Sequence, residues 1–227
     1  MQRTYPILVL SLLLLPLAAC GSGKSELSSA PITGQILEAG TKKPIAGAIV
    51  LVSWLGIYSL PFARPSCYHV ETATTDAEGR FHTEAWRAPK APPEPSAFTL
   101  GSARIDAVYK AGYETYWPPG FDRTQDYKQN IYYLAPFKGT REDRVGYLMH
   151  LSNGADCYGA DEKPLFPLQK ALYQEAKNLA FTPQDQDSVQ WIKHRAVRVW
   201  RSSKISLTDS ESEALIRNDN FLSEQLK

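Results

Sequence analysis

Histidine, cysteine and carboxylate side chains could give this chain metal-ligand or acid–base chemistry, but their spacing limits what they can do. His69-Val70-Glu71 and His82-Thr83-Glu84 each place the two side chains two residues apart, in segments with strand-like composition. Neither a His-Glu-x-x-His helix motif nor a Gly-x-Ser-x-Gly nucleophile turn occurs. Asp76 and Glu78 are paired, but in a turn that ends in glycine, where acids serve turn formation. We therefore predict no catalytic residue, metal ligand or cofactor; an enzyme assembled from unlinked residues is the less favoured alternative.

The N-terminus has the pattern of an export signal. Arg3 precedes the apolar run Tyr5 to Leu17, which ends in Leu17-Ala18-Ala19-Cys20. A positive start, a short apolar segment and small residues before the cleavage point are typical of a secretory signal peptide rather than of a membrane span. We expect 1–19 to be this signal peptide.

Leu17-Ala18-Ala19-Cys20 also resembles the lipobox of bacterial lipoproteins. The resemblance implies that Cys20 becomes the first mature residue and carries lipid, and several acyl chains anchor firmly at ~0.8 kcal/mol per buried CH₂. An ordinary signal peptide with an incidental cysteine is the alternative. Because Gly21 and not aspartate follows Cys20, the resemblance implies the outer membrane, facing the periplasm, with a periplasmic or cell-surface location as alternatives.

Residues 20–30 have the composition of a flexible tether. Gly21-Ser22-Gly23-Lys24-Ser25 ends like a phosphate-binding loop, but the first glycine of that pattern would fall at Ala18, inside the signal peptide. A Gly/Ser-rich linker is the better interpretation.

Net charge excludes one class of partner. Loss of 1–19 removes only Arg3, which leaves 24 of the 25 basic side chains against 24 acidic ones. A neutral chain lacks the basic footprint of a nucleic-acid-binding protein. The expected partners are the membrane, through Cys20, and an envelope protein or glycan.

Cys67 and Cys157 remain once Cys20 is assigned to the lipid anchor. An exported compartment is oxidising, so two remaining cysteines predict one disulfide bond. Metal binding is the alternative, with His69 two residues from Cys67, but the ligand spacing of a zinc site is missing.

Short alternating segments predict β-structure from Ile32 onward. Ile49 to Val52 is apolar on both faces and predicts a central strand, and Ala103 to Tyr109 alternates cleanly. Val70 to Thr75 and Arg80 to Trp86 predict a hairpin around the Asp76–Gly79 turn. The predicted core residues are Ile36, Val50, Val52, Phe81 and Ile105.

Three motifs carry a family resemblance. Thr33-Gly34, Pro44-Ile45-Ala46-Gly47-Ala48 and Thr75-Asp76-x-x-Gly79-x-Phe81 resemble the carboxypeptidase regulatory-like domain, a small sandwich also described as transthyretin-like. Gly112-Tyr113 and the closing segment Ile131 to Leu134 fit the same pattern. The resemblance covers 31–136 and implies a fold more than a function, because this domain is an accessory module on many unrelated proteins.

The chain departs from that family at three places. Glu38 stands where the family often has aspartate, and Lys42 where it often has glycine. Leu55 to His69 is a long insertion between the second and third predicted strands.

After Pro136 the apolar period changes from two to that of a helix. Leu168, Leu172, Ala176 and Leu179 form one apolar stripe, and a second follows the helix start at Thr182-Pro183. We expect an antiparallel helix pair, with Trp191 or Trp200 packed near the sheet. The predicted fold class is α+β: an antiparallel β-sandwich over 31–136, followed by a small helical C-terminal extension over 137–227.

One aromatic stretch is the candidate binding surface. Tyr113, Tyr116, Trp117 and Phe121 lie within nine consecutive residues, 113–121. They could stack on a sugar or peptide, or pack against the helical part. The expected function is a non-catalytic, lipid-anchored envelope module for binding or scaffolding; the alternative is a carbohydrate- or peptidoglycan-binding module that uses this stretch.

The lipid anchor predicts the behaviour of one variant. Cys20→Ala should leave the protein without lipid, since the acceptor sulfur is gone, and the protein should move from the membrane pellet to the soluble fraction. Full retention of the variant in the membrane by a lipid-type attachment would contradict the prediction.

Overall fold

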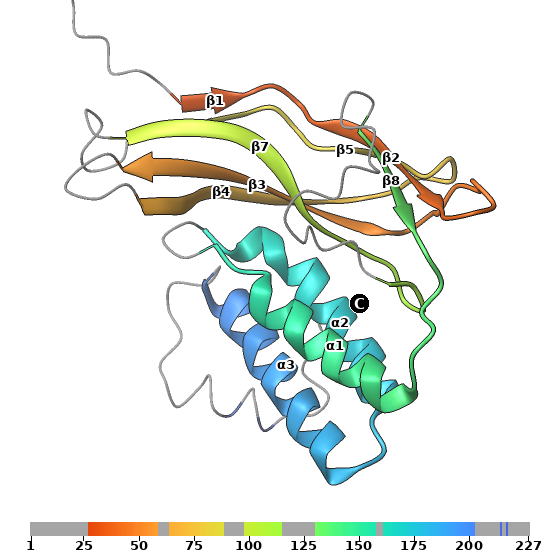
Figure 1. Ribbon diagram of the computed structural model, residues 1–227. Helices are drawn as coiled ribbons and strands as arrows, with labels where there is room; N and C mark the ends of the chain where they lie inside the picture. Colours follow the sequence, from red (N-terminus) through yellow and green to blue (C-terminus); the bar gives the residue numbers. More distant parts are fainter. Residues whose placement is uncertain are drawn as a thin grey trace, which may run out of the picture.

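The computed structural model describes residues 27–58, 64–88, 98–114, 130–157 and 161–202, together with Ala214 and Arg217. Within these residues the chain is α+β, with strands first and helices at the C-terminal end (Figure 1). The strands are β1 (Leu27–Ser29), β2 (Thr33–Glu38), β3 (Ile49–Tyr58), β4 (Arg64–Thr74), β5 (Arg80–His82), β6 (Trp86–Ala88), β7 (Phe98–Tyr109) and β8 (Ile131–Leu134). The helices are α1 (Arg141–Gly154), the 3-10 turn η2 (Lys163–Leu165), α2 (Phe166–Leu179) and α3 (Pro183–Ser202).

Two three-stranded sheets form most of the β-part. One has the order β4-β3-β7 and is antiparallel throughout. The other has the order β5-β2-β8, and β2 runs parallel to β8. The expected all-antiparallel pairing is therefore wrong at β8. Asn130, just before β8, fixes this register: its carbonyl accepts from the Gln35 amide and its side chain donates to the Thr33 carbonyl.

Two other details of the predicted β-part need correction. Leu27–Ser29, at the end of the expected tether, forms β1 and pairs with β6. The predicted hairpin around Asp76–Gly79 does not form, because the turn carries the chain from β4 in one sheet to β5 in the other.

The Leu55 to His69 insertion is also more regular than expected. Leu55–Tyr58 extends β3 and pairs with Arg64–Cys67 of β4, so most of the insertion is the outer half of a long β-hairpin.

The two three-stranded sheets share one hydrophobic core. All five predicted core residues are buried, with at most 8% of any of them exposed, and they come from both sheets. This part of the prediction is confirmed: Ile36, Val50, Val52, Phe81 and Ile105 belong to one cluster.

The helices cover the other face of the β4-β3-β7 sheet (Figure 1). Leu51 and Ala107 point into a second core with the apolar sides of α1, α2 and α3. β3 is therefore buried on both faces, as its unbroken apolar run predicted. The prediction is that one of two tryptophans packs here: Trp200 packs against this core, and Trp191 is 65% exposed.

A buried ion pair fastens the helices to the end of β7. Both oxygens of Glu175 accept from the Arg144 guanidinium, each at 2.9 Å. Arg144 also donates to the carbonyl of Tyr113, and Glu175 accepts from the Tyr109 hydroxyl and the Gly112 amide. Burial, followed by the Glu175 charge, raises the pKa of Tyr109 and keeps its hydroxyl protonated as a donor.

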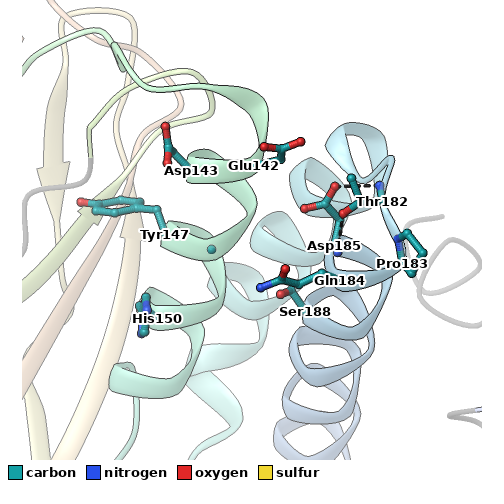
Figure 2. Close-up of a pocket in the computed structure, with 10 residues that line it drawn as sticks. Glu142, Asp143, Tyr147, His150, Thr182, Pro183, Gln184, Asp185 and Ser188 are labelled. Carbon is teal, nitrogen blue, oxygen red and sulfur yellow. Dashed lines mark hydrogen bonds between the residues drawn. The ribbon is translucent and has the colours of Figure 1, made fainter.

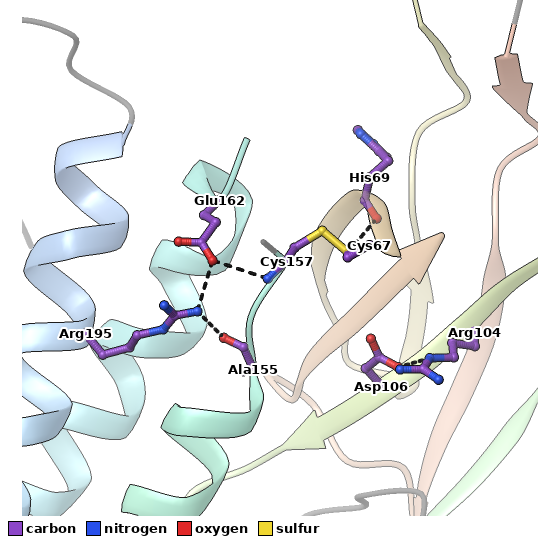
Figure 3. Close-up of a disulfide and its surroundings, with 8 residues drawn as sticks. All are labelled: Cys67, His69, Arg104, Asp106, Ala155, Cys157, Glu162 and Arg195. Carbon is purple, nitrogen blue, oxygen red and sulfur yellow. Dashed lines mark hydrogen bonds and ion pairs between the residues drawn. A yellow bond between two sulfur atoms is a disulfide. The ribbon is translucent and has the colours of Figure 1, made fainter. Parts of the chain in front are cut away.

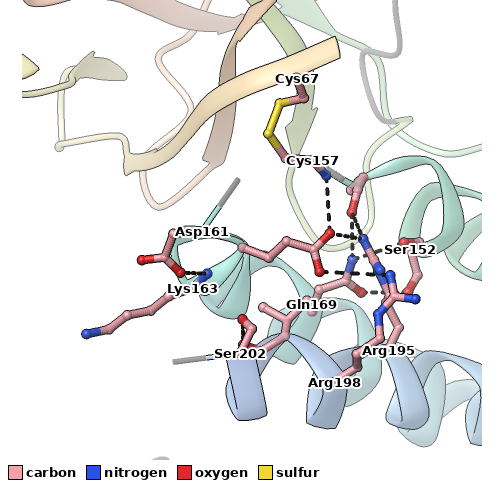
Figure 4. Close-up of polar contacts among 12 residues, drawn as sticks. Cys67, Ser152, Cys157, Asp161, Lys163, Gln169, Arg195, Arg198 and Ser202 are labelled. Atoms are coloured by element: carbon pink, nitrogen blue, oxygen red, sulfur yellow. Dashed lines mark hydrogen bonds and ion pairs between the residues drawn. A yellow bond between two sulfur atoms is a disulfide. The ribbon is translucent and has the colours of Figure 1, made fainter. Parts of the chain in front are cut away.

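The predicted disulfide between Cys67 and Cys157 is present, with the two Cα atoms 4.9 Å apart (Figure 3). It joins β4 to the segment after α1. Beside it, Glu162 accepts from the Cys157 amide and from Arg195 of α3. The side chain of Gln169 completes this region by donating to two carbonyls at the end of α1 (Figure 4).

This crosslink closes a loop of sequence separation 90. We expect the Cys67→Ala/Cys157→Ala protein to lose about 2–4 kcal/mol of unfolding free energy, because the unfolded chain regains the freedom that the crosslink removes. Urea unfolding measures this, with reductant-treated wild type as the comparison. Equal stability of the oxidised and reduced wild-type proteins would contradict it.

Candidate functional site

The candidate site is a groove between the start of α1 and the start of α3, which run in the same direction with α2 antiparallel to both (Figure 1). The hollow has a volume of about 830 Å³. Glu142 points from α1 toward α3, while Gln184 and Asp185 point back from α3 (Figure 2). The groove is lined by Glu142, Asp143, Gly146, Tyr147, His150, Thr182, Pro183, Gln184, Asp185 and Ser188.

Both helices begin with a threonine and an aspartate that cap each other. Thr140 Oγ1 accepts from the Asp143 amide, and the Asp143 carboxylate accepts from the Thr140 amide and hydroxyl. On α3, Asp185 accepts from the amides of Phe181 and Thr182. Hydrogen bonds from these amides are the main cause that lowers the pKa of Asp143 and Asp185. Both carboxylates are thus ionised and engaged in holding the helix ends.

Gly146 opens the middle of the groove. It lies inside α1, and a Cβ built there would meet no atom within 4 Å. Glycine in a helix interior costs about 1 kcal/mol relative to alanine. Packing does not require a glycine here, so its effect on the molecule is the space it leaves between α1 and α3.

The remaining polar groups of the lining belong to four residues of different chemical type. Glu142 adds one carboxylate, His150 an imidazole, Gln184 an amide and Ser188 a hydroxyl. Neither lysine nor arginine is among the lining residues. The groove thus offers a mixture of hydrogen-bond donors and acceptors without a cationic cluster.

Two exposed aromatic side chains come from the segment 181–191, which also contributes lining residues, although neither of the two lines the groove itself. Phe181, immediately before the lining residue Thr182, is 81% exposed. Trp191 is 65% exposed and follows Gln184 by seven residues and Ser188 by three, which places it on the same side of α3. Aromatic side chains are enriched among the residues that contact partners at protein interfaces.

A second hollow, of about 630 Å³, is lined mainly by residues of β2, of β5 and of the turn before β5. Its arginine is already engaged: Arg80 pairs with Asp76 and Glu78. The Asp76 carboxylate in turn accepts from the backbone amides of Glu78 and Arg80 and closes the turn, and the Arg80 amide is the largest cause that lowers its pKa. This hollow therefore offers fewer uncommitted groups than the groove.

The predicted binding residues are only partly within the described structure. Tyr113 is half-buried, and its hydroxyl donates to Glu38 while its carbonyl accepts from Arg144. These contacts fix its position at the edge of the β-part. Tyr116, Trp117 and Phe121, like Cys20, lie outside the described residues, so the aromatic stretch and the lipid anchor remain predictions.

The groove is not predicted from the sequence, because no helix is predicted over Arg141–Gly154. Two signals were present: Thr140-x-x-Asp143 has the form of a capping box, and Thr182-x-x-Asp185 repeats it at α3. Only the second was interpreted as a helix start.

In the described residues, no group of three or more His, Cys, Asp or Glu side chains is arranged to hold a metal ion. Over the same residues, no helix combines the length and the hydropathy needed to cross a bilayer.

Comparisons with known proteins do not place the chain in a family. No family model and no curated protein matches it. Among solved structures, a 9R-lipoxygenase from Cyanothece is 15% identical, with a TM-score of 0.20. The match covers 66% of this chain and 24% of the lipoxygenase. A likeness this low supports no conclusion about fold or activity.

The open space at Gly146 predicts a stabilising substitution. Gly146→Ala should raise the free energy of unfolding by up to about 1 kcal/mol, because alanine favours the helix and its methyl group meets no neighbour. Urea unfolding of the variant beside wild type measures the change. A destabilised variant would show that the backbone of α1 needs glycine at this position.

Proposed function

We propose that this chain is an exported, lipid-anchored envelope protein that works as a non-catalytic binding module, with the α1–α3 groove as its binding surface. The observation that carries the proposal is the pair of exposed aromatic side chains, Phe181 and Trp191, beside a polar hollow. Tyr and Trp side chains are enriched where proteins bind their partners, and a truncated interface tryptophan often costs more than 2 kcal/mol of binding free energy.

Export is supported by the disulfide. Cys67 and Cys157 pair, and disulfide bonds persist in oxidising compartments such as the periplasm. The proposed arrangement is a signal peptide over 1–19, lipid on Cys20, and a short tether that ends where β1 begins. The expected membrane is the outer one, with the protein facing the periplasm.

The proposed fold of 31–136 is the carboxypeptidase regulatory-like sandwich, with helices α1, α2 and α3 of the C-terminal extension packed on its outer face. Two features support this assignment. The two three-stranded sheets share a core, and Gly47 and Gly79 of the family motifs have φ values of 67° and 71°. Lys42, where the family often has glycine, has a φ of 60°, so the backbone keeps the conformation that glycine favours.

A non-catalytic role is supported by the state of the groove carboxylates. General acids and bases work best with a pKa near the ambient pH. Hydrogen bonding lowers the pKa of Asp143 and Asp185 instead, and both carboxylates are committed to helix caps. These two carboxylates therefore hold the helix ends in place and are not suited to donate a proton to a ligand.

Site-specific crosslinking in cells tests the proposal. A photo-crosslinking amino acid at Trp191 of the full-length protein should give adducts after illumination, on protein or on cell-wall material. The same amino acid at the exposed neighbour Gln190, which lies 100° further round α3, is the matched control and should give fewer. Equal yields at the two positions, or none at either, would contradict the use of this surface.

A further inference from the structure

The chemistry of the groove narrows the kind of ligand that it fits. We propose that it binds an uncharged glycan, a chain of several sugar rings; this inference rests on the proposed function. The sugar hydroxyls would bond to the polar lining, and ring faces would stack on Trp191 and Phe181.

The charge of the lining argues against the main alternatives. An anionic ligand such as a phosphate needs cationic partners, and neither lysine nor arginine lines the groove. A cationic peptide would need uncommitted carboxylates. Asp143 and Asp185 are engaged at the helix ends, and the charge of Arg141 also acts on Asp185. Glu142 is the one lining carboxylate for which the structure gives no such bond. A basic peptide would therefore meet a single uncommitted negative charge in the groove.

The polar groups that remain match hydroxyl groups. A sugar hydroxyl both donates and accepts, so it suits side chains of mixed character. Glu142 accepts, while Gln184 and Ser188 can do both. A groove built for an apolar helix would instead be lined by aliphatic side chains, and leucine, isoleucine, valine and methionine are all missing from this lining.

The two aromatic side chains extend the proposed binding surface beyond the groove, along α3. Phe181 lies just before the N-terminal end of α3, and Trp191 lies about 12 Å along the helix from its first residue, Pro183, eight residues at about 1.5 Å each. This distance exceeds one sugar ring, so an oligosaccharide can reach from one aromatic to the other. A flat apolar face beside hydrogen-bonding groups is the combination that tryptophan provides at ligand sites.

Direct binding measurements on the purified full-length protein test this inference. The probes are a β-1,4-linked glucose hexamer and its N-acetylglucosamine counterpart, which differ only in the N-acetyl group. We expect a dissociation constant of millimolar or tighter for at least one, nearly unchanged between about 50 and 500 mM salt, because no charged contact is screened. The hexamer that binds more tightly reports whether the groove selects N-acetylated sugars.

Variants of the groove separate specific from general binding. Trp191→Ala should weaken binding about tenfold or more, as expected for a truncated anchor residue. Gly146→Leu should do the same by filling the groove, and it keeps a good helix former in α1. Gln190→Ala is the control and should bind like wild type. Thermal melts of all three variants confirm folding.

Three results would overturn the inference: binding of neither hexamer at millimolar concentration, undiminished binding by both groove variants, or preferential binding of hexalysine that salt abolishes. Crosslinks from position 191 to a protein partner, together with no glycan binding, would overturn the glycan assignment and leave the proposed function standing. No crosslinks of any kind would remove the proposed function itself.

Discussion

The packing of the helices against the β4-β3-β7 sheet depends on the bidentate ion pair between Arg144 and Glu175. Arg144 is 3% exposed, and the carboxylate of Glu175 takes two bonds from it and one each from Tyr109 and Gly112. Loss of one partner of such a buried pair leaves an uncompensated charge and costs about 3–5 kcal/mol. The pair therefore commits α1, α2 and the end of β7 to one geometry, which apolar packing alone specifies less strictly.

The disulfide acts at the opposite end of α1, so the helix is fixed to the sheet near both ends. Arg144 lies in its first turn, and Cys157 follows its last residue by three. α1 spans about 21 Å, from 14 residues at about 1.5 Å each. Because α3 packs on both α1 and α2, the groove between α1 and α3 has two rigid walls. A ligand would then meet a surface that needs little ordering on binding, which favours affinity.

The sequence predicted the elements whose apolar pattern is unambiguous. The two-sided apolar run of β3 and the stripes of α2 and α3 are examples, and the Cys67–Cys157 pairing followed from composition and export. The predictions that failed concern strand pairings, which are set by contacts between segments far apart in the sequence. The parallel pairing of β8 is set by bonds between Asn130 and β2, and β5 joins a different sheet from β4, although a turn of hairpin composition connects them. α1 was missed because Arg144 occupies a buried position that a stripe of apolar residues would mark. The groove was missed with it, since both walls are needed to recognise the space above Gly146.

The character of the groove follows from the way the helices begin. Two parallel helices that start side by side bring the positive ends of their dipoles together, and each must also satisfy its first unpaired amides. Asp143 and Asp185 meet both demands, so the acids that give the rim its negative charge are used by the fold. What is left for a ligand is the carboxylate of Glu142, the imidazole of His150, the amide of Gln184 and the hydroxyl of Ser188, together with the gap at Gly146 and the exposed ring of Trp191. In this arrangement helix capping engages two of the three carboxylates that line the groove and leaves a surface of low charge, which suits recognition of polar, uncharged ligands.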